Sequence, residues 1–159
     1  MAVEVFTQNS DASGYRKRPI DAHGKLRFHY SDFGPLTVAG DAGSTYELGK
    51  LPPGPVRLLP CLSRWECSAY GAARVLKTGH KEYRKAQDGA VVDDGLEADD
   101  DNAFQSAVDI SGALSNQVLG TALKFDMYST AGVDLYATVT GGTSPIGATI
   151  AWLIAYLYE

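Results

Sequence analysis

The sequence predicts an all-β fold: an antiparallel β-sandwich of the jelly-roll or immunoglobulin type. Short segments of strand-like sequence recur about every ten residues and are separated by turn signals, which is typical of sandwiches. The composition, with 17 Gly and 9 Tyr, favours strands and turns over helices. Three prolines within residues 52–55 exclude a helix at that point.

The chain divides into an arm and one domain. Residues 1–24 mix polar, basic and Gly-rich stretches without helical or strand periodicity, which predicts an extended N-terminal arm. A chain of 159 residues has the length of one domain with one hydrophobic core. We therefore expect a single β-sandwich domain over residues 25–159.

The first half of this domain contains several predicted strands. Leu26, Phe28 and Tyr30 alternate with polar residues, which predicts a first strand with one buried face. Residues 65–78 suit a helix or a strand, and we prefer a strand because the surrounding sequence is strand-like. Further short strands are expected over residues 45–48 and 56–59.

The middle of the chain changes sharply in charge. The acidic stretch over residues 88–101 predicts a solvated loop. The basic stretch before it, residues 74–85, is open to several interpretations: a solvated segment, contact with a partner protein or phosphates, or pairing with the acidic stretch within the fold or between subunits.

The last third has the clearest strand pattern. Turn sequences at residues 130–132 and 141–147 predict two hairpins. The closing strand, residues 148–158, is apolar on both faces, so it is central in its sheet or covered by a partner. Other strands are predicted over residues 104–110, 118–119, 123–128 and 133–139.

Some aromatic residues are candidates for contact with a partner. Trp and Tyr are enriched at interface hot spots, which makes Trp152, Tyr156 and Tyr158 of the closing strand candidate partner-binding residues. Trp65 is expected in the core.

No catalytic, cofactor-binding or metal-binding residue is predicted. Residues 43–50 depart from the phosphate-loop pattern in glycine spacing and in the final residue. The EF-hand pattern counted from Asp99 lacks its glycine and its closing glutamate, although another kind of calcium site in the acidic stretch stays open. The three histidines have no metal-ligand spacing, and no nucleophile motif is present. We therefore expect a protein that is not an enzyme and has no cofactor.

Charge and hydropathy limit the classes of partner that we expect. A net charge of −5 disfavours nucleic-acid binding. Neither a membrane span nor a secretory signal is evident. Cys61 and Cys67 are expected to be free thiols.

Two segments resemble small structural virion proteins of tailed bacteriophages: LPPGPVRLLPCLSRWECSAYGAARVL (residues 51–76) and the closing VDLYATVTGGTSPIGATIAWLIAYL (from residue 133). The resemblance extends over about residues 40–159 and carries no catalytic residue. It implies a jelly-roll-like sandwich that binds the outside of a capsid as a decoration or cement protein, as a homodimer or homotrimer.

The predicted function is therefore a capsid cement protein whose partners are the major capsid protein and itself. We expect it on the capsid surface of a virion assembled in the host cytoplasm. Arg16, Lys17 and Arg18 of the arm would then seek carboxylates on a partner. The alternatives are a neck, tail or fibre-associated virion protein, and a carbohydrate or host-surface binding module with Trp65 or Tyr70 as its platform.

Overall fold

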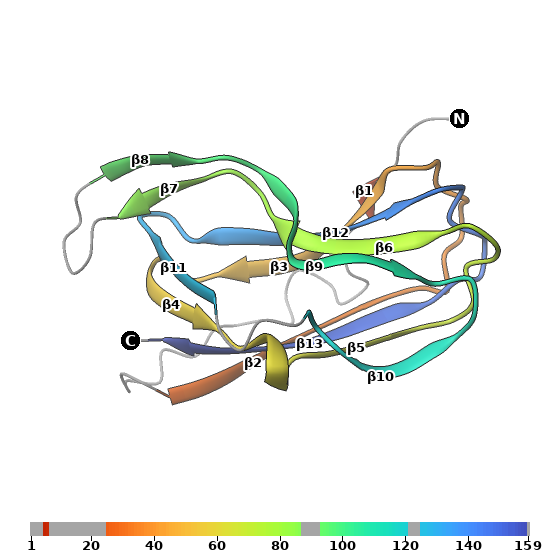
Figure 1. The fold of residues 1–159 in the computed structure, drawn as a ribbon, viewed down its shortest axis with the longest axis horizontal. Coiled ribbons are helices and arrows are strands. Elements are labelled where there is room, and N and C mark those ends of the chain that lie inside the picture. The colour runs from red at the N-terminus through yellow and green to blue at the C-terminus, as the bar shows by residue number, and fades with distance from the viewer. Residues whose placement is uncertain (1–4, 7–24, 87–92, 121–124, 159) are drawn as a thin grey trace.

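Two β-sheets packed face to face form the fold in the computed structural model, which describes residues 5–6, 25–86, 93–120 and 125–158 (Figure 1). The five-stranded sheet contains, in spatial order, β1 (Val5–Phe6), β3 (Ser44–Leu51), β12 (Val133–Thr140), β6 (Val75–His80) and β9 (Asp100–Asp109). The eight-stranded sheet follows the path β10 (Leu114–Val118), β5 (Arg64–Cys67), β13 (Ile150–Tyr158), β4 (Gly54–Leu58), β11 (Phe125–Ser129), β7 (Tyr83–Ala86) and β8 (Asp93–Glu97), with β2 (Lys25–Phe33) paired to β13.

The strand pairing is nested, as in a jelly roll. β2 pairs with β13, β3 with β12, β5 with β10 and β6 with β9, all antiparallel. Strands from the two ends of the domain therefore pair with each other, and strands from its middle do the same, as when one long hairpin is wrapped into two sheets. The predicted all-β, antiparallel, jelly-roll-like sandwich is confirmed. Of the predicted arm, Val5–Phe6 form β1, which runs parallel to β3.

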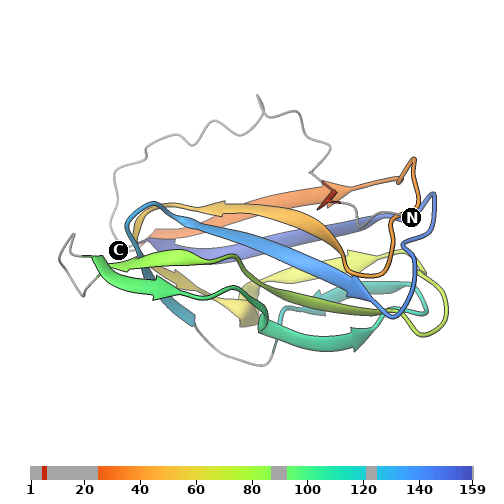
Figure 2. The same ribbon diagram turned by 90° about the horizontal axis from the view of Figure 1, so that it is seen from above.

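The core lies between the two sheets and is rich in aromatic side chains. Trp65 is 2% exposed, as expected for a core residue. The ring of Phe33 meets those of Tyr46 and Trp152 edge-on, at centroid distances of 5.4 and 5.9 Å, the geometry that aromatic quadrupoles favour. The closing strand β13 has β2 along one edge, side by side with it in Figure 2, and both β5 and β4 along the other. Of the two alternatives expected for this strand, the structure therefore shows the central position in the sheet.

Both predicted hairpins are wrong. Residues 130–132 join β11 of the eight-stranded sheet to β12 of the five-stranded sheet, and residues 141–147 return the chain from β12 to β13. A turn sequence indicates that the chain reverses, but a reversal inside one sheet and a crossing between two sheets use the same turn residues. Strand pairing in this chain is therefore long-range, as the nested topology requires.

Two other local expectations met different outcomes. The ambiguous stretch 65–78 contains the end of β5 and most of β6, so the preference for strand is confirmed for residues 65–67 and 75–78, whereas residues 68–74 connect the two strands. The acidic stretch is not simply a loop: its described part forms β8 and the start of β9, while residues 87–92 lie outside the described residues. The described part of the chain contains no helix long and apolar enough to cross a membrane.

In β2, the first strand of the domain, the face that was expected to be buried is the exposed one. Leu26, Phe28 and Tyr30 are 44%, 46% and 55% exposed, whereas Ser31 on the alternate face is buried and donates a hydrogen bond to the Leu48 carbonyl oxygen at 2.5 Å. The alternation correctly predicts a strand with one apolar face, but this face points away from the sandwich core.

Candidate interaction surface

The residues predicted to bind a partner lie in different environments. Trp152 and Tyr156 are 1% and 6% exposed, so they belong to the core of the single chain and not to its surface. Tyr158 is half-buried, and the guanidinium carbon of Arg27 lies 5.7 Å from the centre of its ring. The three basic residues of the arm, Arg16, Lys17 and Arg18, lie outside the described residues.

The aromatic platform suggested for carbohydrate binding is not formed by the residues named for it. Trp65 and Tyr70 are 2% and 1% exposed. The Tyr70 hydroxyl donates to the Tyr46 hydroxyl at 3.2 Å, and the Tyr46 hydroxyl donates to Ser144 Oγ at 3.1 Å. These side chains form a hydrogen-bonded cluster inside the protein, so the expectation of a Trp65 or Tyr70 platform is wrong.

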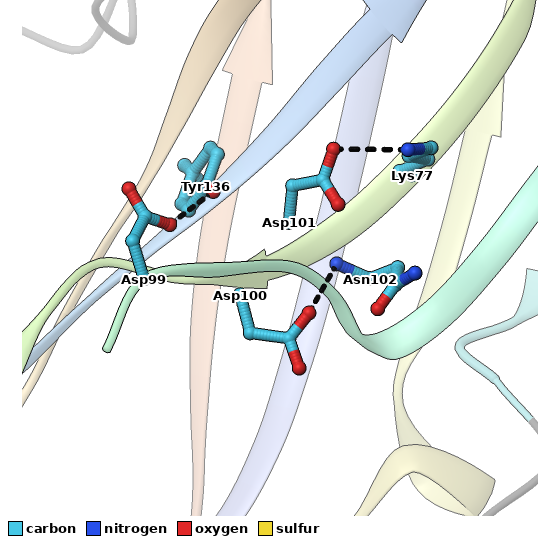
Figure 3. A network of polar contacts seen from close by, with 6 residues as sticks. All are labelled: Lys77, Asp99, Asp100, Asp101, Asn102 and Tyr136. Carbon is cyan, nitrogen blue, oxygen red and sulfur yellow. Dashed lines mark hydrogen bonds and ion pairs between the residues drawn. The ribbon is translucent and has the colours of Figure 1, made fainter. Parts of the chain in front are cut away.

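The acidic stretch is engaged by donors of its own fold (Figure 3). The Tyr136 hydroxyl donates to the carboxylate of Asp99, and Lys77 Nζ lies 3.1 Å from Asp101 Oδ2. Asp100 accepts a backbone hydrogen bond at 3.0 Å. The basic stretch thus pairs with the acidic stretch within the fold, one of the interpretations left open. No group of three or more metal-ligating side chains was found within residues 5–6, 25–86, 93–120 and 125–158.

The histidines do not converge with a nucleophile. His80 is 2% exposed, its Nδ1 lies 3.1 Å from the Lys81 carbonyl oxygen, and its ring packs edge-on against Tyr83. His29 lies on β2, where its ring fills the space over Gly49. Both rings therefore act as packing groups in the interior, and His23 lies outside the described residues.

The outer face of the five-stranded sheet is charged. Lys50 Nζ lies 3.5 Å from Asp134 Oδ2, and Lys81 Nζ lies 5.5 Å from the centre of the Tyr136 ring. A cavity of about 410 Å³ is bordered by Lys50, Lys81, Asp134 and Glu47. Because most of these charges have a neighbour of opposite sign or an aromatic ring, this face is typical of a solvated surface.

The outer face of the eight-stranded sheet is apolar over β2 and β13. We call it the β2–β13 face, and it comprises Leu26, Phe28, Tyr30, Ala151, Leu153 and Leu157. Tyr30 pairs with Leu153 and Leu26 with Leu157 across the two strands, so the apolar side chains form a continuous surface. Exposed apolar residues gathered on one face mark an interaction site, whereas single ones scattered over a surface do not.

A groove ends this face near the start of β13. Ala151 pairs with Asp32 on one side and with Glu66 on the other, so the two carboxylates flank a small residue in one row of the sheet. A cavity of about 450 Å³ and a second of about 170 Å³ both border Tyr30, Glu66 and Ala151. Burial, followed by the negative charges of Asp32 and Glu66, raises the pKa of Tyr30. The groove therefore has two carboxylates and an aromatic wall. Arg64 borders the smaller cavity, and its guanidinium donates to the carbonyl oxygens of Cys61 and Ser63.

The sequence signalled only part of this surface. The alternation of Leu26, Phe28 and Tyr30 indicates an apolar face, but the expectation that this face points to the core is wrong. Asp32 and Glu66 were not identified, because they are far apart in the chain and only their common neighbour in β13 brings them together.

Comparison with known proteins gives the fold a context. No protein-family model matches the sequence, and no curated protein matches it. A solved structure described as the capsid of Ralstonia phage GP4 contains a similar chain, with a TM-score of 0.65 and 20% sequence identity over 98% of both chains. The capsid asymmetric unit of cyanophage Pam1 contains another, with a TM-score of 0.51 and 12% identity over 95% of this chain and 97% of that one. The protein therefore shares, over nearly its whole length, the fold of chains found in two phage capsids.

Proposed function

We propose that this protein is a structural, non-enzymatic virion component of a tailed phage that binds the outer surface of the capsid as a cement or decoration protein. It acts as a homo-oligomer, a dimer or a trimer, on shells assembled in the host cytoplasm. Its partners are the major capsid protein and other copies of itself.

The observation that carries the proposal is the full-length match to the chain in the capsid of Ralstonia phage GP4, which spans 98% of both chains. Fold alone does not determine function, because one fold serves many functions. A match that spans nearly the whole of both chains nevertheless supports a similar use of the unit, and the match to the cyanophage Pam1 chain has the same property.

The β2–β13 face supplies the contact surface that this role needs. Its three exposed residues on β2 are large and apolar, and covering them against another subunit would contribute about 25 cal/mol for each Å² of apolar surface removed from water. A protein that binds only the assembled shell stabilises that shell through its binding free energy. Many copies engaged together increase this effect without any catalytic chemistry.

Quantitative mass spectrometry of purified particles tests the proposal, together with the thermal stability of shells that lack this protein. We expect a copy number comparable with that of the major capsid protein, and lower thermal stability of shells without it. A copy number corresponding to a single ring would indicate the neck or tail instead. Absence from particles would refute the virion role altogether.

A further inference from the structure

The groove over Ala151 brings together two carboxylates that have no hydrogen-bond or ion-pair partner among the described residues. Most other carboxylates are paired with a cation or accept a hydrogen bond. These include Glu97, Asp99, Asp100, Asp101, Asp109, Asp126 and Asp134. Asp32 and Glu66 have neither kind of contact in the described part of the chain, yet they lie in one row on either side of Ala151. Adjacent strands are about 4.8 Å apart, so about 10 Å separates the two backbones that carry these carboxylates.

The shape and charge of the groove fit a cationic side chain. Ala151 leaves space between the carboxylates, as the cavity of about 450 Å³ shows. The Tyr30 ring, 55% exposed, borders the same cavity and offers the π-face on which guanidinium groups stack. Carboxylates at both sides and an aromatic ring at the wall are together the groups that recognise arginine best.

The same sequence contains one run of three consecutive cationic residues, Arg16, Lys17 and Arg18. We propose that the groove over Ala151 binds residues 16–18 of a neighbouring copy of this chain, with Asp32 and Glu66 pairing with its cationic side chains and Tyr30 stacking on one of them. This inference rests on the proposed function, because it names the contact that links copies on the shell.

Chain length permits either the same copy or a neighbouring copy as the source of the segment. From the Lys25 side, seven residues at about 3.3 Å each equal the length of β2 up to Asp32, so residue 18 reaches the groove of its own chain only when fully extended. From the other side, ten residues separate Phe6 from Arg16, and Phe6 pairs with Tyr46, whose ring contacts Phe33 at the same cavity. We assign the segment to a neighbouring copy because the proposed function already requires contacts between copies.

Such a contact joins two different surfaces, an arm on one copy and a groove on the next. Contacts of this kind repeat from copy to copy and close into a ring when the rotation between copies allows it. Each copy in a closed ring then both donates an arm and accepts one. The inference therefore fits a cyclic oligomer, such as a homotrimer, more simply than a dimer with a single symmetric contact.

Sedimentation velocity and equilibrium of the full chain test this contact. Two variants remove the two sides of it: Asp32→Asn with Glu66→Gln, and Arg16→Gln with Lys17→Gln and Arg18→Gln. We expect each variant to weaken self-association by at least about tenfold, as loss of paired charges at an interface does. Combining the two variants should weaken it little further, because both remove one interaction. Glu47→Gln with Glu82→Gln is the matched control, and it should leave self-association unchanged.

A second measurement shows whether the groove itself recognises the segment. Titration of the ¹⁵N-labelled protein with a synthetic peptide of residues 11–22 should shift the amide signals of Ala151 and its neighbours saturably. The same peptide with Gln at positions 16, 17 and 18 should produce no saturable shift, and neither peptide should shift the signals of the Asp32→Asn, Glu66→Gln variant. Thermal unfolding midpoints verify that each variant folds.

Several outcomes would overturn the inference. Wild-type protein that remains monomeric, or a groove variant that associates like the wild type, would exclude this contact between copies. An arm variant that loses only shell binding would assign residues 16–18 to the capsid protein. Saturation of the groove signals by Ca²⁺ or a neutral disaccharide, with no response to the peptide, would assign the groove to that ligand. Binding of the wild type to stripped shells, followed by co-sedimentation, reports separately on the proposed function.

Discussion

The Ser63 hydroxyl accepts a hydrogen bond from the Ala155 amide at 2.9 Å, at the place where β13 changes its neighbour from β5 to β4. The short 3₁₀ helix Pro60–Leu62 interrupts the ladder there, so no strand carbonyl takes this amide. Ser63 is fully buried and donates in turn to the Leu59 carbonyl oxygen at 3.0 Å. One side chain therefore substitutes for a missing ladder bond at the centre of the sheet.

Replacement of this serine should destabilise the sandwich. In Ser63→Ala the buried Ala155 amide loses its acceptor, which costs about 1–3 kcal/mol. Equilibrium unfolding in urea measures the change in the free energy of unfolding. Ser68→Ala is the matched control, because the Ser68 hydroxyl also accepts an amide hydrogen bond at 2.9 Å, from Thr149, but at an exposed position where water replaces it. Equal losses in the two variants would contradict this explanation.

Gly79 allows the close approach of β6 and β9. A Cβ at this position would lie 1.7 Å from the backbone oxygen of Asp100, which cannot move without shifting the strand. Gly79→Ala should therefore lower the free energy of unfolding by at least about 1–3 kcal/mol, as overpacking does. In the control, Gly112→Ala, the added methyl group meets no atom within 4 Å. A near-neutral Gly79→Ala in the same urea titration would show that β9 adjusts freely.

The buried tyrosines should make the protein sensitive to alkali. Burial is the main reason that the pKa values of Tyr46 and Tyr70 lie above the ordinary value of 10.0. Below about pH 10 both phenols are neutral in the folded and unfolded states, so stability does not change on their account. As the pH rises further, the unfolded chain loses these protons first, and the free energy of unfolding falls.

Tyr70→Phe tests this pH dependence. The variant loses one buried hydrogen bond, worth about 1 kcal/mol at neutral pH, but it also loses one of the buried phenols that oppose folding in alkali. We therefore expect a shallower decline of stability between pH 9 and pH 12 than in the wild type. Urea unfolding followed by circular dichroism at each pH gives the slope, and parallel curves for the two proteins would exclude this role for Tyr70.

The sequence predicts the fold class well because a buried strand can be recognised from the apolar residues of its own segment. The closing strand β13 is apolar on both faces, and it occupies the centre of its sheet. The two turn sequences also marked true chain reversals, yet both were assigned to the wrong pairing, since β12 pairs with β3 and β6 and with neither of its neighbours in the chain. Which strands meet depends on interactions between distant segments, and turn residues do not encode it.

The candidate site was harder to predict for the same reason. Asp32 and Glu66 lie on different strands and become neighbours only through Ala151. The sequence also does not indicate which face of β2 points to the core. An alternating strand has one apolar face whether the core or a partner covers it. The acidic stretch is conspicuous in the sequence through its density of charge, yet Glu97, Asp99, Asp100 and Asp101 are engaged by donors within the fold.

The final prediction tests the β2–β13 face through Leu26, which is 44% exposed and paired with Leu157. Leu26→Gln removes apolar surface that the capsid would cover, so binding to shells stripped of this protein should weaken by about tenfold, since burial of a leucine side chain contributes about 1.5–3 kcal/mol. Stability in urea should change little, because the side chain lies on the outer face of the sheet and outside the hydrophobic core. Quantitative co-sedimentation with stripped shells measures the affinity.

Leu96→Gln is the control for this experiment, since Leu96 is 55% exposed and lies on β8, away from the β2–β13 face. We expect this variant to bind shells like the wild type. If both variants bind equally well, the exposed apolar residues of β2 are not the capsid contact, and the charged outer face of the five-stranded sheet becomes the better candidate. If Leu96→Gln alone weakens binding, the contact lies at the β7–β8 end of the molecule.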